Sequence, residues 1–412
     1  MISSYLYQLF VNAPVFKIKE EGAEHFRTHL EKEINRARTE SGKQTDSELI
    51  EFLIASQYSE LTSFFTKNPL LEIFYLVNSF HEYRQNEAAY DELGRFKYNN
   101  SIQYHLGIQK NQVLFLMLDL TGNDPEISRF LTVHSHKSYF YLSHDIDSVH
   151  GALLQDGAWA LKNGRMDVIL KLIFNTVMQR PDWMNMDLIM KTVSEKDFVS
   201  TFYWLVNQGK IDERQTNSDY NIHSELIKKN ISEIEKKGFK NGLHKSISKE
   251  SFAQELSKTP FKTKDNRYHY LKFKLPDAYH HIEEAGLETD ASLGFAEHFG
   301  FRNSYGYPFH PYNTEKNQAF SFLEIPLNVM DGTFQRYMKI PVNETANQII
   351  RFLEENSQNA LLSILWHNTF FSSYKYKGYL DEYKKVLDYL YQNKFKCLSL
   401  DQINQEFRWK TK

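Results

Sequence analysis

Residues 139–147 read YFYLSHDID, an apolar run that ends in two carboxylates, Asp145 and Asp147. Residues two apart on an extended chain project to the same face, so both acids can enter one site. Parallel α/β folds place metal ligands and bases at the carboxyl ends of their strands. For this stretch alone, an Asp-rich turn that caps its own backbone is the simpler interpretation. Because later strands end in the same way, we favour a functional site over a turn.

The chain after residue 133 alternates between strand-like and helix-like patterns. We expect strands at 138–144, 200–207, 239–244, 267–273, 286–291, 321–329, 360–367 and 395–399. We expect helices between them at 151–178, 221–237, 249–258, 275–285, 342–356 and 376–393. Such alternation predicts an α/β fold with a parallel sheet, open or closed into a barrel.

Histidine or aspartate recurs at the ends of these strands. In chain order these are Asp145 and Asp147, His244, then His269 within its strand, Asp290 and His367. Because the carboxyl ends of parallel strands meet at one edge, this recurrence predicts an enzyme. The chain has a single cysteine, so a metal would depend on imidazoles and carboxylates.

Each of these residues also has a structural interpretation. His244 could bind a divalent metal beside Asp147, or cap a backbone carbonyl. Arg267 and His269 alternate onto one face, where they could serve catalysis or a buried ion-pair network. His367 ends an apolar strand and could act as a general acid, or be a histidine at the rim.

The bulk properties exclude several classes of protein. A length of 412 residues predicts two or three domains, and the formal charge of -3 gives no electrostatic case for nucleic acid or anionic membrane. No stretch approaches the roughly 20 apolar residues of a membrane span, and residues 1–10 do not resemble a signal peptide. A cytoplasmic location is therefore expected. Signatures for phosphate-binding loops, serine hydrolases, zincins and dinucleotide sites are missing.

The first 133 residues indicate mixed α/β structure without obvious chemistry. Apolar residues have helical spacing over 47–65 and 70–83, whereas 112–118 fits either a strand or the core of a helix. The turn cluster at 121–125 is a plausible exit from this region.

An ordered set of motifs resembles the polysaccharide deacetylase family, in particular a bacterial branch with an extra N-terminal domain. These motifs are at 143–147, 242–244, 267–271, 290–295, 300–302, 308–309, 324–327, 329–331 and 365–367. The N-terminal patterns of that branch resemble 80–83 and 91–96. The resemblance covers about residues 70–400.

The resemblance implies a distorted (β/α) barrel over 134–412, preceded by a smaller α/β N-terminal domain over 1–133. The family removes N- or O-acetyl groups from sugars with a divalent metal, often zinc. By this resemblance Asp145 is the general base, Asp147 and His244 are metal ligands, His367 is the general acid and Arg302 holds the base.

One position departs from the family pattern. The second metal histidine usually comes four residues after the first, where this chain has Ser248. We therefore expect His269 to be the third ligand, since catalytic zinc normally has three protein ligands. Arg267 and Asp290 are expected to bind the acetylated saccharide.

Three functions follow from the sequence. The first is a metal-dependent deacetylase, with a surface polysaccharide or its precursor as substrate. The second, motivated by Ser248, is a non-catalytic carbohydrate-binding or scaffold protein on the same barrel. The third is another metal hydrolase, such as an amidase for a small molecule.

Overall fold

A parallel sheet forms the centre of the molecule, as the alternating pattern predicted. The computed structural model describes residues 1–19, 22–178, 180–212 and 215–409. The strand order is β10-β7-β6-β5-β4-β3-β12-β11, with β13 beside the start of β3. The strands are β3 (Tyr139–Ile146), β4 (Thr201–Leu205), β5 (Lys240–Lys245), β6 (Asp265–Tyr268), β7 (Thr289–Asp290), β10 (Leu323–Glu324), β11 (Val329–Met330), β12 (Leu361–Leu365) and β13 (Lys396–Cys397).

The sheet curls into an incomplete barrel. Laid flat, strands about 4.8 Å apart would put the edge strands β10 and β11 roughly 34 Å from each other. Only residues 325–328 join these two edges, and such a link spans at most about 18 Å. The sheet must therefore bend round, although β10 and β11 do not pair with each other in the strand order that the described residues form.

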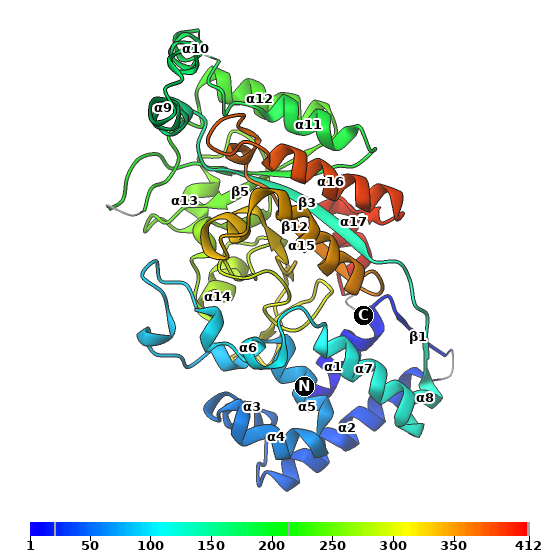
Figure 1. Cartoon of the computed structure of the whole chain (residues 1–412). Coiled ribbons are helices and arrows are strands. Elements are labelled where there is room, and N and C mark those ends of the chain that lie inside the picture. Colours follow the sequence, from blue (N-terminus) through cyan, green and yellow to red (C-terminus); the bar gives the residue numbers. More distant parts are fainter. Residues whose placement is uncertain (20–21, 179, 213–214, 410–412) are drawn as a thin grey trace.

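Helices cover the outside of this sheet (Figure 1). They are α9 (Ala152–Lys162), α10 (Met166–Val177), α11 (Met186–Ser194), α12 (Glu225–Lys236), α13 (Phe252–Leu256), α14 (Asp277–Glu284), α15 (Val342–Glu355), α16 (Tyr379–Gln392) and α17 (Leu400–Phe407). The single helix predicted over 151–178 is two helices, because Gly164 turns the chain with a φ of +68°. The helix predicted from Lys249 begins at Phe252, because Ser251 caps it and forms a capping box with Gln254.

The N-terminal region is mainly helical, which corrects the α/β prediction for residues 1–133. In its described residues, strands β1 (Phe16–Ile18) and β2 (Leu131–Val133) form a short antiparallel pair. Residues 112–118 lie in helix α7, which buries Val113, Leu114 and Met117 along one face. The helices are α1 (Ile2–Asn12), α2 (Ala23–Glu40), α3 (Asp46–Ala55), α4 (Tyr58–Lys67), α5 (Pro69–Val77), α6 (Gln103–Leu106), α7 (Gln112–Asn123) and α8 (Pro125–Phe130).

Buried side chains connect the two regions without a break. One hydrophobic core runs from α1 to α17 and includes residues of both the helical region and the sheet. The division into two domains at residue 133 stays a prediction. Among the helices of the described ranges, none is both long enough and apolar enough to cross a membrane.

His310 illustrates how this core constrains titratable groups. Its Nδ1–H donates to the carbonyl of Phe320, and its Nε2 accepts from the backbone N–H of Trp409. Burial lowers the pKa of His310 to about 4, although the hydrogen bond to Phe320 acts in the opposite direction. The folded protein therefore holds this imidazole neutral at pH 5, whereas the unfolded chain protonates it below about 6.5.

We expect His310→Gln to reduce the acid sensitivity of the fold. Between pH 7 and pH 5, His310 becomes protonated in the unfolded wild-type chain but not in the native state. This difference lowers the stability of the wild type by on the order of 2 kcal/mol. Glutamine can replace both hydrogen bonds without titrating. Urea unfolding at the two pH values gives the free energy of unfolding of each protein. The difference between wild type and variant should be smaller at pH 5 than at pH 7. An unchanged difference would contradict the neutral state of His310.

Candidate metal centre

Neighbouring strands bring two of the predicted ligands together. Asp147 follows β3 directly, and His244 lies near the end of β5, with only β4 between these strands. Asp147 Oδ1 is 3.3 Å from His244 Nε2. The side chain of Asp147 is 31% exposed, whereas that of His244 is buried. The pair therefore lies at the mouth of the barrel with its carboxylate reachable from outside.

His269 joins them from a turn that the sequence did not predict. The sequence predicted a strand over 267–273. Strand β6 instead ends at Tyr268, because Tyr270 and Leu271 take left-handed conformations with φ of 60° and 54°. This turn places His269 Nδ1 3.5 Å from Asp147 Oδ1 and 3.0 Å from His244 Nε2. Backbone strain at two residues thus delivers a third ligand atom to the same point.

Hydrogen bonds at the far side of each ring fix the protons of both histidines. His244 Nδ1 is 2.9 Å from the carbonyl oxygen of Arg267, and His269 Nε2 is 3.0 Å from that of Thr216. A carbonyl only accepts, so each of these ring nitrogens carries the proton. The inner nitrogens are left with lone pairs directed at each other and at Asp147. This arrangement of outer partners is typical of metal-binding histidines.

The three ligand atoms fit a small divalent cation. Asp147 Oδ1 is buried and has no hydrogen-bond donor among the described residues. Ligands on tetrahedral zinc lie about 3.3 Å apart, given bonds of about 2.0–2.2 Å. The observed separations are 3.0, 3.3 and 3.5 Å. Within the described part of the chain, no other group of three His, Cys, Asp or Glu residues is arranged to hold a metal ion.

Ser248 plays no part in this centre. Its hydroxyl donates to Glu255 and accepts from Ser246, in a separate network next to α13. The third potential ligand atom comes from His269.

Arg267, rather than Arg302, holds Asp145. Arg267 is fully buried, and its Nη1 lies 3.0 Å from Asp145 Oδ1 while its Nε donates to the carbonyl of Ala291. The other oxygen, Asp145 Oδ2, is 3.5 Å from His244 Nε2. Asp145 is thus fixed on one side by a permanent cation, with its second oxygen directed towards the metal centre.

The predicted contact between Arg302 and the base is wrong. Arg302 forms a bidentate ion pair with Glu82, at 3.1 and 2.6 Å, and also donates to the carbonyl of Gly294. Both charged side chains are buried, with exposed fractions of 2% and 1%. Arg302 therefore connects the N-terminal region to the barrel and does not reach Asp145.

His367 faces the centre from β12 and has a carboxylate behind it. Its Nδ1 is 2.7 Å from Asp331 Oδ1, and its Nε2 is 3.7 Å from Asp147 Oδ2. Burial acts to lower the pKa of His367, but Asp331 and Asp147 outweigh it and raise this pKa to about 9. Asp331 was not predicted in this role, although it follows β11 as Asp147 follows β3.

Asp290 lies away from the centre. It is buried and accepts from Asn266 Nδ2 at 2.6 Å, and it lies beside Glu324. Burial, with the neighbouring Asp290 carboxylate, raises the pKa of Glu324 well above its usual range. Asp290 does not line the cavity at the centre, so the predicted contact with substrate is not supported.

A cavity of about 40 Å³ opens at the metal centre. This is room for about three water molecules or one small substituent. Arg95 reaches it from the N-terminal region, held by Asp91 and by the hydroxyl of Tyr337. The motif at 91–96 contains Arg95, but no role at the site was predicted for this residue. The cavity is lined by Arg95, Asp145, Asp147, His244, Tyr268, His269, Tyr270, Leu271, Ala296, Met330, Gly332, Arg336, Tyr337, Leu365, His367 and Phe370.

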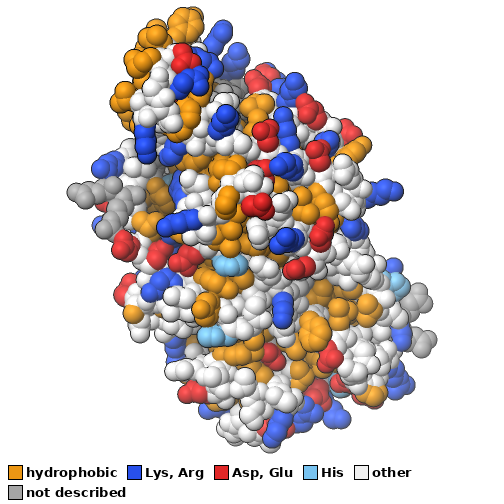
Figure 2. All heavy atoms as spheres, in the orientation of Figure 1, with side chains coloured by type: hydrophobic (Ala, Val, Ile, Leu, Met, Phe, Trp, Pro, Cys, Tyr) orange, Lys and Arg blue, Asp and Glu red, His pale blue; other side chains and the backbone are white. Residues whose placement is uncertain are grey.

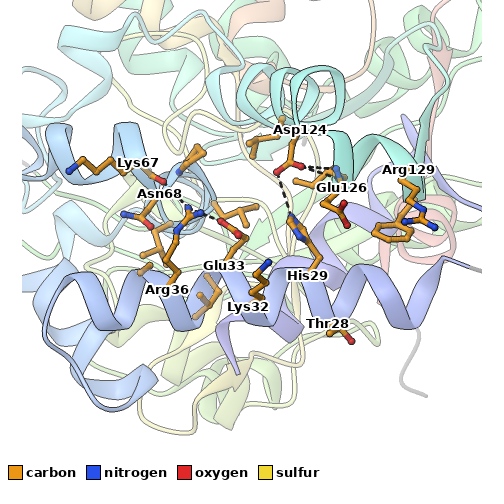
Figure 3. A pocket seen from close by; sticks show the side chains of 18 of the residues that line it. Thr28, His29, Lys32, Glu33, Arg36, Lys67, Asn68, Asp124, Glu126 and Arg129 are labelled. Carbon is orange, nitrogen blue, oxygen red and sulfur yellow. Dashed lines mark hydrogen bonds and ion pairs between the residues drawn. The ribbon is translucent and has the colours of Figure 1, made fainter.

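A wider hollow of about 660 Å³ lies far from this centre, against α2, α5 and α8 (Figure 3). Two of its acids are already paired: Asp124 with His29, and Glu33 with Arg36. No set of ligand atoms converges here within the described residues. We therefore place the candidate site at the smaller cavity.

Comparisons with known proteins give weak likenesses. No family model matches the chain, and no curated protein matches it. A putative polysaccharide deacetylase from Mycobacterium smegmatis is similar at 11% identity and a TM-score of 0.41, over 66% of this chain and 91% of that one. A peptidoglycan deacetylase from Bacillus subtilis has 11% identity and a TM-score of 0.28, over 66% and 92%. A 4-alpha-glucanotransferase from Thermococcus litoralis has 10% identity and a TM-score of 0.38, over 66% and 39%.

Proposed function

We propose that this protein is a divalent-metal-dependent hydrolase that removes acetyl groups from a saccharide, with zinc as the metal. The observation that carries the proposal is the convergence of Asp147 Oδ1, His244 Nε2 and His269 Nδ1 within 4.8 Å of one another. Both imidazoles present lone pairs at this point, because their outer nitrogens donate to carbonyl groups. Three acceptors directed at one another are unfavourable unless a metal ion or a proton lies between them, and we propose the metal ion.

The chemistry follows from the groups around this point. When bound there, the divalent cation supplies Lewis acidity that polarises an acyl carbonyl and acidifies water. Asp145 Oδ2 accepts the proton of the attacking water, while Arg267 fixes the other oxygen of that carboxylate. His367 Nε2 faces the cavity and donates a proton to the departing amine or alcohol. Asp331 holds the His367 ring in this orientation by accepting from Nδ1.

The cavity supports an acyl group as the reacting part of the substrate. About 40 Å³ accommodates an acetyl group but not a sugar ring, so the sugar would lie outside. We propose a cytoplasmic surface-polysaccharide precursor as the saccharide. The non-catalytic alternative was motivated by Ser248, and His269 offers the third ligand that Ser248 does not.

Metal analysis and acetate release together test this proposal. The purified protein should contain about one zinc per chain, and chelation should abolish acetate release from acetylated saccharides, with zinc restoring it. A panel of N- and O-acetylated sugars beside small amides separates a deacetylase from a small-molecule amidase. Saccharide binding without metal and without acetate release would instead establish the carbohydrate-binding alternative.

A further inference from the structure

Helices α9 and α10 form a hairpin that, with the residue after it, carries about half of the large exposed hydrophobic side chains in the described ranges. Of fifteen large hydrophobic side chains that are exposed among the described residues, eight lie between residues 154 and 178. They are Leu154, Leu161, Met166, Leu170, Ile173, Phe174, Val177 and Met178. Figure 2 shows these hydrophobic side chains gathered at the end of the molecule that Figure 1 labels α9 and α10.

The exposed side chains of α10 lie on one face of the helix. Positions 166, 170, 173, 174 and 177 follow the three- and four-residue spacing of a helical stripe. The opposite stripe, with Val168 and Leu172, is buried against the rest of the protein. Phe174 is 62% exposed and Val177 74%. Since scattered single apolar residues are the norm on protein surfaces, a contiguous face of this kind indicates an interaction surface.

Positive charge surrounds this face. Exposed Lys162, Arg165, Lys171 and Arg180 belong to the same segment, against one exposed acid, Asp167, which pairs with Arg165. Lys375 extends over α9 and donates to Gln155. The chain as a whole carries a formal charge of -3, so this local basic excess is a property of the hairpin. The whole-chain charge gave no case for an anionic membrane because it averages over this local basic excess.

We infer that the α9–α10 hairpin docks on the surface of an anionic lipid bilayer. An amphipathic helix with Leu, Ile, Phe and Val on one side and Lys or Arg beside them lies in the membrane interface, its apolar side inserted among the acyl chains. Anionic headgroups match the basic flanks. A second copy of this chain fits less well, because two basic hairpins repel each other. The inference depends on the hairpin alone and is independent of the proposed hydrolase activity.

The hairpin is attached to the sheet next to the candidate metal centre. Helix α9 begins at Ala152, five residues after Asp147, so the hairpin leaves the sheet at the end that holds the ligands. Asn368, next to His367, donates to the carbonyls of Ser148 and Trp183 on either side of the hairpin. The hairpin is thus fixed to the rim of the cavity by direct hydrogen bonds.

Vesicle sedimentation with the full-length protein tests the inference. The wild-type protein should pellet with vesicles of equal parts phosphatidylglycerol and phosphatidylcholine. Much less of it should pellet with vesicles of pure phosphatidylcholine. In the Leu170→Gln/Phe174→Gln variant, binding should fall by about tenfold for each side chain replaced. Phe115→Gln is the matched control, because Phe115 on α7 is 61% exposed and lies outside the hairpin. This control should bind as the wild type does.

Three outcomes would overturn the inference. They are the absence of binding to anionic vesicles, equal loss of binding in the control, and binding that does not weaken as salt is raised. Sedimentation velocity without lipid tests the alternative that a second copy of this chain covers the surface. A dimer that the double variant converts to monomers, with no vesicle binding by the wild type, would assign this surface to a second copy of the chain. Because both substituted side chains are exposed, thermal unfolding of the variant should match that of the wild type.

Discussion

Asp147→Asn is expected to purify without metal, whereas Asp145→Asn keeps its metal and loses activity. The two substitutions remove the same charge from residues two positions apart, so they form a matched pair. Asp147 Oδ1 lies 3.3 and 3.5 Å from the two histidine ligand atoms, and a neutral amide at this position is a poor ligand. We expect zinc affinity to fall at least about a hundredfold in Asp147→Asn.

Asp145→Asn should lower acetate release about a thousandfold, because an amide cannot accept the proton of the attacking water. The amide oxygen can still accept from Arg267, so that buried guanidinium keeps an acceptor. Metal content by elemental analysis, circular dichroism and acetate release are measured on both variants. Metal retention by both, or more than a tenth of wild-type activity in Asp145→Asn, would contradict the assigned roles.

Arg302→Met should destabilise the fold by about 3–5 kcal/mol, because it leaves the Glu82 carboxylate buried without its cation. Three aromatic rings, those of Phe273, Phe295 and Phe96, lie within 4.6 to 5.8 Å of the guanidinium carbon, so no water can replace the lost charge easily. Urea unfolding monitored by tryptophan fluorescence gives the change in stability.

The double variant Glu82→Leu/Arg302→Met separates the structural role of this pair from a catalytic one. It leaves neither charge alone, so we expect it to recover much of the stability lost in Arg302→Met. It should also retain acetate release, because Arg302 does not contact Asp145. A double variant that folds but does not release acetate would indicate that Arg302 has a catalytic role. Destabilisation equal to the sum of the two single changes would show that the pair is not coupled.

The sheet was predictable because its signal is local. Apolar runs such as 139–144 and 360–365, each bounded by turn or helix patterns, identified the central strands to within a few residues. The predictions were poorest where a strand is short or ends in a turn. The segment 267–273 alternates like a strand throughout, yet β6 stops at Tyr268 where two residues take left-handed conformations. Side-chain alternation does not reveal backbone torsion.

The helical character of residues 1–133 was only partly visible, in the helical spacing over 47–65 and 70–83. Segments such as 112–118 are apolar enough to fit a strand or a buried helix, and only their neighbours decide between the two. Helix α7 forms because α5 and α8 pack beside it and bury one of its faces. Sequence periodicity over seven residues cannot show this.

The sequence by itself indicated which residues to propose for chemistry and at which strand ends they lie. Asp145, Asp147 and His367 follow from apolar runs that end in polar side chains, and His244 from its place at a predicted strand end, since parallel pairing directs strand ends to one edge. Only the tertiary structure decided how these groups are partnered. Arg267 rather than Arg302 holds Asp145, and Asp331 lies behind His367. The physical reason is range: strand patterns depend on adjacent residues, whereas these ion-pair partners lie 36 to 220 residues apart in the sequence and meet only in the folded chain.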